Sequence, residues 1–270
     1  MSATKGTCKR ERIGGSLMKR AMALPVLGLC LVILVGCGGN DNRNSNASAT
    51  STDNWQLGGA GSTVPQLGGA LALTNSTISG SMPIIDGSYD SGSCFTPDQL
   101  FSLSGTVDPQ GNISGTASSG SGLVMIFTGV LDSSRSSISL GNYTFNGGCA
   151  DGDSGPLAGV RFKPVTGIYV GTLGDTAVSA NLTQSNLGQK LNGYLHLSGT
   201  VTYTGPTCSE VFTIEESSLA GSYIQLSLTA KDGTSTSVGG HVVDSTASQL
   251  DLADYEGGCG SGGYGTLIQQ

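Results

Sequence analysis

The chain has 270 residues, 44 of them glycine, and a formal net charge of −7 at pH 7. Glycine at this level, without runs of strong helix formers, disfavours a helical protein. The acidic balance also disfavours nucleic-acid binding, which needs clustered Lys and Arg to neutralise phosphates. These two exclusions leave a β-rich protein whose partners are not nucleic acids.

The first feature along the chain is an apolar run from Ala21 to Val35, preceded by Met18-Lys19-Arg20. The run is shorter than the roughly 20 apolar residues of a membrane-spanning helix. A charged start, an apolar segment and a small residue before the cleavage point are the layout of a secretory signal. The stretch Leu34-Val35-Gly36-Cys37 resembles the lipobox of bacterial lipoprotein signals.

This resemblance implies that residues 1–36 are a signal peptide and that Cys37 carries the lipid. By the same resemblance, Gly38 in place of Asp after the cysteine favours the outer membrane, so we expect a lipid-anchored protein on its periplasmic face or at the cell surface. Two interpretations of the start stay open, an unusually long charged region or translation from Met18, and we favour Met18. Residues 37–53 are polar and of low complexity, which predicts a flexible tether behind the lipid.

Cleavage would change the charge of the chain. The predicted signal peptide holds six of the 12 basic residues and one of the 19 acidic residues, so the remaining chain has 6 and 18 and a net charge of −12. Such a surface favours neutral or cationic partners over anionic ones.

Beyond the tether, apolar residues alternate with polar ones. From residue 191 to residue 203, Leu195, Leu197 and Val201 fall on one face, whereas His196 and Ser198 fall on the other. Ile224, Leu226 and Leu228 repeat this pattern further on. A period of two predicts strands with one face in a core and one in water, so we expect an all-β fold.

The chain also contains an internal duplication. Trp55 precedes Cys94 by 39 residues, and Tyr169 precedes Cys208 by 39 residues. Four further matches follow in the same order, and they are Phe95-Thr96 with Phe212-Thr213, Ser102–Gly105 with Ser218–Gly221, Tyr143 through Cys149 with Tyr255 through Cys259, and a glycine-rich loop after each second cysteine. The duplication predicts two tandem β domains, residues 54–163 and 164–270, of about eight strands each.

Meanders of hairpins suit either a small antiparallel β-barrel or a β-sandwich. The openings Asn54-Trp55-Gln56 and Gly167-Ile168-Tyr169 resemble the aromatic first strand of calycin barrels such as lipocalins and avidins. The overall layout resembles duplicated lipoproteins of soil bacteria, which implies location and architecture but no activity. A single barrel or sandwich built from both halves is the competing architecture.

Four cysteines remain behind Cys37, which allows three pairings. The duplication favours Cys94–Cys149 and Cys208–Cys259, because each copy should then close on itself. Loops of about 50 to 55 residues make each bond worth about 4 kcal/mol in the chain-entropy description. A zinc site is the alternative, but the chain has no Cys-x-x-Cys pair.

Residues for catalysis are scarce. His196 and His241 are the chain's two histidines, and both lie in the second copy. A triad of Ser218, His196 and Asp244 is conceivable, but no Gly-x-Ser-x-Gly elbow supports it. We expect solvated histidines and no enzyme activity. Acidic residues such as Glu215, Glu216, Asp251 and Asp254 are interpreted as solvated strand faces and turns, by the same reasoning.

Asp151 and Asp153, just after Cys149, alternate with glycine as in loops that bind calcium. The distal Glu of an EF-hand is missing, so an acidic turn is the favoured interpretation and calcium the lesser one. We expect no metal and no cofactor.

Two functions remain. The first is a non-enzymatic binding module for a small or apolar ligand, because a barrel of about eight strands can hold one. The second is a structural or interaction lipoprotein with solid-packed domains that contacts other envelope proteins or surface polysaccharide. The inward faces of the strands distinguish the two functions. If side chains fill the core, no room for a ligand remains.

Overall fold

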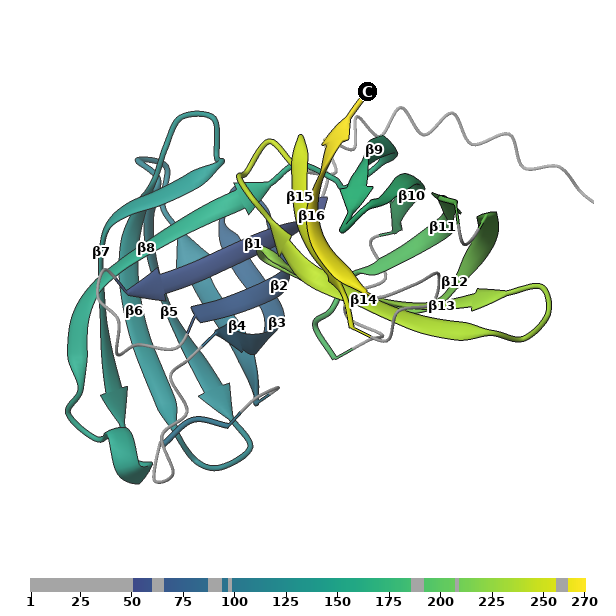
Figure 1. Cartoon of the computed structure of the whole chain (residues 1–270). Helices are drawn as coiled ribbons and strands as arrows, with labels where there is room; N and C mark the ends of the chain where they lie inside the picture. Colours follow the sequence, from purple (N-terminus) through teal and green to yellow (C-terminus); the bar gives the residue numbers. More distant parts are fainter. Residues whose placement is uncertain are drawn as a thin grey trace, which may run out of the picture. The chain divides into compact units, whose positions relative to one another are not determined.

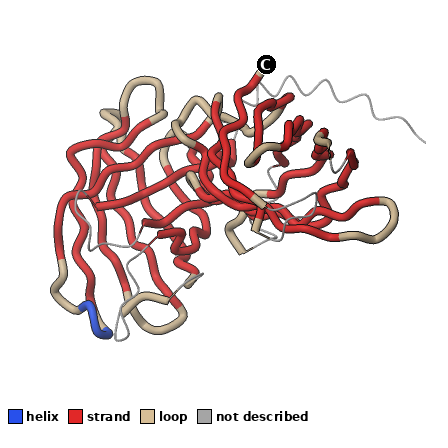
Figure 2. The backbone as a smooth tube through the Cα atoms, in the orientation of Figure 1, coloured by secondary structure: helices blue, strands red, loops and turns tan. Residues whose placement is uncertain are grey.

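The structure, a computed structural model, describes residues 51–59, 66–86, 94–96, 99–185, 192–206, 209–255 and 262–270. The predicted signal peptide, Cys37, the tether up to residue 50 and the pair Cys208 and Cys259 lie outside these ranges. Within the described ranges, no helix is long and apolar enough to cross a bilayer. Strands dominate the backbone, as Figure 2 shows.

The strands form two closed antiparallel barrels in tandem (Figure 1), which confirms the predicted all-β tandem fold and decides for barrels over sandwiches. The first barrel contains β1 (Ser51–Gly59), β2 (Gln66–Leu73), β3 (Thr77–Asp86), β4 (Leu100–Val107), β5 (Asn112–Ser119), β6 (Val124–Leu131), β7 (Ser137–Asn146) and β8 (Ser154–Phe162). The second contains β9 (Gly167–Leu173), β10 (Thr176–Ser185), β11 (His196–Thr204), β12 (Ser209–Ala220), β13 (Tyr223–Ala230), β14 (Ser235–Val242), β15 (Gln249–Asp254) and β16 (Gly263–Gln269).

Each barrel is a simple meander that closes when its first strand pairs with its last. β1 pairs with β8, and β9 pairs with β16. Closure removes the free sheet edges that would otherwise pair with other chains. β1 begins at Ser51, so the last three residues of the predicted tether belong to the barrel.

Large apolar side chains fill each barrel. Trp55 and Phe101 are completely buried in the first, and Tyr169 and Phe212 are completely buried in the second. The alternation predicted from the sequence is confirmed in β11 and β13, where Leu197 and Leu226 point into the core. The first-strand aromatics of the two repeats therefore have the same role.

The two copies of the Phe-Thr motif do not occupy equivalent places. Phe95 lies in the connection before β4, whereas Phe212 lies inside β12. Phe101 is the true counterpart of Phe212, because each pairs with the last residue of the following strand, Ser119 and Ala230 respectively. The repeats therefore agree in topology more closely than in local sequence.

A disulfide joins Cys94 to Cys149, as the duplication predicted for the first copy. Cys94 lies in the β3–β4 connection, and Cys149 lies in a 3-10 turn (Gly148–Ala150) between β7 and β8. In an antiparallel meander these two connections lie at the same end of the barrel. The ring of Phe95, next to the disulfide in sequence, packs on that of Phe145 with centroids 5.4 Å apart. Cys94 and Phe95 thus hold the β3–β4 connection against the apolar core of the first barrel.

The two barrels belong to one compact unit and touch through a specific contact. The amide of Asn54, in β1, donates to the Gly221 carbonyl at 2.8 Å and accepts from the Gly221 N–H at 2.6 Å. Gln56 accepts from the Ser222 N–H at 2.9 Å. Gly221 has a φ of +57°, which glycine adopts without strain. The turn between β12 and β13 is therefore held against the first barrel.

Apolar contact supports these hydrogen bonds. Ala70 of β2 and Phe162 of β8 belong to the apolar core cluster of the second barrel. The backbones also approach closely at Gly68, where a Cβ atom would lie 2.6 Å from the backbone of Ala220. Side chains larger than hydrogen do not fit there.

We expect Asn54→Ala to lower the free energy of unfolding by about 2–4 kcal/mol, because it leaves the buried N–H and C=O of Gly221 without partners. Urea unfolding of the mature chain measures this loss. Asn181→Ala, on the exposed outer face of β10, is the matched control and should change stability by less than about 0.5 kcal/mol. Equal effects of the two variants would contradict the role assigned to Asn54.

Cys208 and Cys259 belong to the β11–β12 and β15–β16 connections, which correspond in topology to those that carry Cys94 and Cys149. We therefore expect peptide mapping of the oxidised, unreduced chain to find a Cys208–Cys259 peptide beside the Cys94–Cys149 peptide. A peptide that links cysteines of different barrels would contradict this prediction.

Candidate functional site

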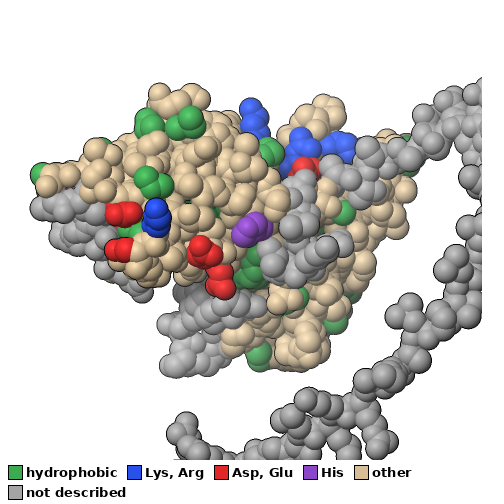
Figure 3. All heavy atoms as spheres, turned by 90° about the vertical axis from the view of Figure 1, so that its right-hand side faces the viewer, with side chains coloured by type: hydrophobic (Ala, Val, Ile, Leu, Met, Phe, Trp, Pro, Cys, Tyr) green, Lys and Arg blue, Asp and Glu red, His purple; other side chains and the backbone are tan. Residues whose placement is uncertain are grey.

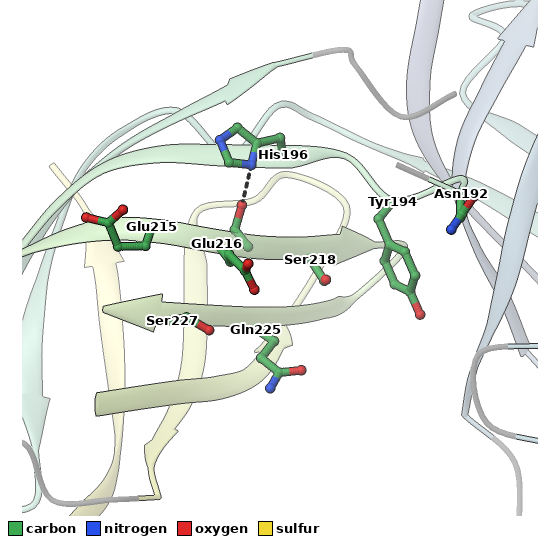
Figure 4. A pocket seen from close by; sticks show the side chains of 9 residues that line it. Asn192, Tyr194, His196, Glu215, Glu216, Ser218, Gln225 and Ser227 are labelled. Atoms are coloured by element: carbon green, nitrogen blue, oxygen red, sulfur yellow. Dashed lines mark hydrogen bonds between the residues drawn. The ribbon is translucent and has the colours of Figure 1, made fainter. Parts of the chain in front are cut away.

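A hollow of about 530 Å³ lies on the outer surface of the second barrel, over β11, β12 and β13. Its lining is mostly polar, and it comes from Asn192 and Tyr194 before β11, His196 at the start of β11, Glu215–Ser218 of β12, and Gln225 and Ser227 of β13. In Figure 4, Glu215 lies at one end, Tyr194 and Asn192 lie at the other, and Glu216 lies between them. We call this the acidic hollow.

A β-bulge in β12 creates the acidic hollow. The pairing of β12 with β13 shifts register between Ile214 and Glu216. Ile214 and Leu219 are both buried, although five residues of a regular strand would place them on opposite faces. The extra residue lets both point inward and leaves Glu215 and Glu216 consecutively exposed.

The bulge could have been found from the sequence. Core residues of a regular strand lie an even number of positions apart, so two core residues an odd number apart require an inserted residue between them. The expectation that Glu215 and Glu216 are solvated is confirmed, but their shared position over a hollow was missed.

His196 has a hydrogen-bond partner on the neighbouring strand. Its Nδ1 lies 2.9 Å from Oγ of Ser217 (Figure 4). The same hydroxyl donates to the Leu197 carbonyl at 2.8 Å, and its oxygen accepts from the Leu197 N–H at 2.7 Å. Because the hydroxyl proton is held by the backbone, Ser217 is an anchor for His196 and not a free nucleophile.

The structure does not assemble the conceivable triad. His196 bonds to Ser217 and not to Ser218. Asp244 lies in the β14–β15 connection, where the side chain and the N–H of Thr246 bond to it and lower its pKa. His241 lies on the outer face of β14, in a different hollow.

The predicted calcium residues lie in a turn. The carboxylate of Asp151 accepts from the Gly147 N–H at 2.7 Å, as a turn residue does. Burial is the main cause that raises the pKa of Tyr143, and the negative charge of Asp153 is the second. Among the described residues, no three His, Cys, Asp or Glu side chains come close enough to hold a metal ion.

On the face shown in Figure 3, some acidic side chains lie beside a histidine and others lie beside a Lys or Arg. The linings of the acidic hollow and of the hollow around His241 contain no Lys or Arg among the residues described. Electrostatically, this outer surface suits a cationic or neutral ligand better than an anionic one.

One acidic residue does not follow the sequence expectation. Asp254 is 8% exposed, so its interpretation as a solvated residue is wrong. It continues the inward positions Leu250 and Leu252 of β15 and accepts from the Thr236 hydroxyl at 2.9 Å. Burial is the main cause that raises the pKa of Tyr203 well above its usual value, and the neighbouring Asp254 carboxylate adds to the increase. The hydrogen-bonded pair of Asp254 and Thr236 lies inside the second barrel, so we assign it a structural role.

Comparisons with known proteins add little beyond this geometry. No protein-family model matches the chain, and no curated protein matches it. Among solved structures, the chain is similar to a double mutant of the vaccine antigen transferrin-binding protein B from Haemophilus parasuis Hp5, at 11% identity and a TM-score of 0.22. The match covers 76% of this chain and 60% of that chain, so this chain matches about three fifths of that protein's length. At this TM-score, the likeness carries no inference about ligand or partner.

We expect the stability of the protein to fall as the pH rises above about 10. The pKa of Tyr203 is higher in the folded protein than in the unfolded chain, so the unfolded chain loses this proton first. The contribution of the neutral phenol is complete below pH 10 and is lost as the pH rises further. Melting temperatures between pH 8 and 11 measure the slope.

Tyr203→Phe should reduce this alkaline slope without abolishing it, because burial also raises the pKa of Tyr169. Tyr264→Phe, at a residue that is 82% exposed, is the control and should keep the slope of the parent protein. An unchanged slope in Tyr203→Phe would contradict the assignment.

Proposed function

We propose that this chain is a lipid-anchored protein of the bacterial cell envelope that binds a small cationic ligand on the outer surface of its second barrel. Cys37, with the apolar run and charged residues before it, supports the anchor. Two acyl chains hold a protein on a bilayer firmly, whereas one chain binds only marginally. The outer membrane is the location that Gly38 favours.

The filled interiors argue for a ligand on the outer surface. An eight-stranded barrel is just wide enough either to be filled by side chains or to hold one small ligand. Here Trp55 and Phe127 occupy the first interior, and Tyr169 and Phe212 occupy the second, each with at most 1% exposure. An apolar ligand inside a barrel would have to displace these residues, so we place the ligand outside.

The observation that carries the proposal is the bulge that presents Glu215 and Glu216 side by side over the acidic hollow. Two adjacent carboxylates favour a cation, and the rest of the lining offers hydroxyl, amide and imidazole groups for hydrogen bonds. The ring of Tyr194, at the end of the hollow, can add attraction to a cation through its π face. Bulges recur at sites where a strand must redirect side chains for function.

We infer a binding role and not an enzymatic one. The backbone of Leu197 fixes the hydroxyl of Ser217, so the hydroxyl that bonds to His196 is not free to act as a nucleophile. A fixed, polar and open hollow of this kind can orient a ligand without chemical change.

A second candidate is a structural or interaction lipoprotein that holds no small molecule. The solid packing of both barrels and the hydrogen-bonded contact at Gly221 favour this function, because they make a rigid body suited to protein contacts. Recovery of a stoichiometric envelope protein with the anchored chain would support it, provided that no small cation binds.

Binding of cationic probes tests the proposal. We expect spermidine, arginine or choline to bind the mature protein in calorimetric titrations, with an affinity that falls as salt is added. The double variant Glu215→Gln/Glu216→Gln should bind at least about tenfold more weakly, since it removes both charges and keeps the size of the side chains.

Glu210→Gln is the matched control, because Glu210 lies on the same strand outside the hollow and should leave binding unchanged. The proposal is wrong if none of the three cations binds, or if the control and the double variant lose affinity equally.

A further inference from the structure

A second hollow, of about 450 Å³, lies on the outer surface of β14, β15 and β16. Strand register arranges its lining in two rows. One row contains Gly239, Ala253 and Tyr264, which pair across the three strands. The next row contains His241, Asp251 and Thr266, paired in the same way. The rows are two residues apart, or about 7 Å.

The first row supports two exposed aromatic rings. Tyr264 is 82% exposed and Tyr255 is 65% exposed. Tyr255 lies against Gly239, where a Cβ atom would come within 2.9 Å of its Cε2 atom, so the glycine makes room for the ring. Exposed tyrosines on a rigid sheet provide large, amphipathic contact surfaces that lose little conformational entropy on binding. We call this pair the tyrosine platform.

The second row presents oriented polar groups beside the rings. Asp251 Oδ1 accepts from the Thr266 hydroxyl at 2.7 Å and from the Gln249 amide at 3.1 Å. These bonds fix the carboxylate before any ligand arrives, and preorganisation lowers the cost of binding. His241, opposite Asp251 on β14, adds a ring nitrogen that can donate or accept.

We propose that the tyrosine platform binds a neutral saccharide. A pyranose ring has an apolar face of C–H groups, which the electron-rich face of an aromatic ring attracts, and an edge of hydroxyl groups, which carboxylate, imidazole and hydroxyl partners bind. An aromatic row beside a polar row matches this division.

The charge and shape of the site favour a neutral sugar over other ligands. Its lining holds one carboxylate and no Lys or Arg, so an anionic ligand is repelled and a cation meets less negative charge than in the acidic hollow. The hollow is open to the surface, which gives a lipid chain no enclosed apolar space. This site uses none of the residues of the acidic hollow, so the proposal stands or falls independently of the proposed function.

Calorimetric titration of the mature protein with cellohexaose, maltohexaose and chitohexaose tests the proposal. We expect at least one of these oligosaccharides to bind. Tyr264→Ser and Tyr255→Ser should each weaken that binding about tenfold, whereas Tyr264→Phe should retain it within about threefold because the ring remains.

Leu140→Ser is the matched control, because it removes an 85% exposed apolar side chain from the first barrel and should not change binding. Folding of the variants is checked by their melting temperatures. The proposal is overturned if no hexasaccharide binds, if the serine variants bind like the parent protein, or if Glu215→Gln/Glu216→Gln weakens sugar binding while the tyrosine variants do not.

Discussion

Hydrogen bonding between the first and last strands of each repeat is the constraint on which the rest of the structure depends. When β1 meets β8 and β9 meets β16, every strand has two neighbours and one side turned inward. Each inward position must then be filled within an eight-stranded cylinder, and aromatic and branched side chains fill it. Polar side chains therefore lie mostly on the outer surface and in the strand connections, and the buried pair of Asp254 and Thr236 is an exception.

The second barrel shows how the outer surface becomes differentiated under this constraint. Its outer face runs continuously from β11 to β16, because Gln225 of the acidic hollow pairs directly with Gly239, which lines the hollow beside the tyrosine platform. The bulge in β12 alters the alternation without opening the barrel, so it presents two carboxylates while Ile214 and Leu219 stay buried. Gly239 in β14 leaves room over the sheet for the ring of Tyr255. Local irregularities thus create sites on a scaffold whose core stays regular.

The sequence predicted the fold well because the fold depends on alternation and duplication. Leu197, Leu226 and the first-strand aromatics Trp55 and Tyr169 are buried as their periodicity requires. The disulfide between Cys94 and Cys149 agrees with a repeat that closes on itself. Barrel and sandwich could not be separated, because the pairing of the first and last strands leaves no local pattern in either strand.

The candidate sites were harder to predict because they combine residues from three strands. The grouping of His196, Ser217 and Glu216 depends on register, which a single strand does not reveal. The burial of Asp254 was predictable in principle, since it extends the inward series of Leu250 and Leu252. Its charge concealed this pattern, because buried carboxylates are rare and a hydrogen-bond partner such as Thr236 is distant in sequence.

The shared position of Ala70 limits how far the two repeats can be separated. It belongs to a strand of the first barrel yet lies in the apolar core of the second, where Phe162 also contributes. The two repeats are therefore not interchangeable, since the apolar cluster of the second barrel takes residues from the first, whereas that of the first contains none from the second. A second barrel expressed without the first would leave part of its apolar core uncovered.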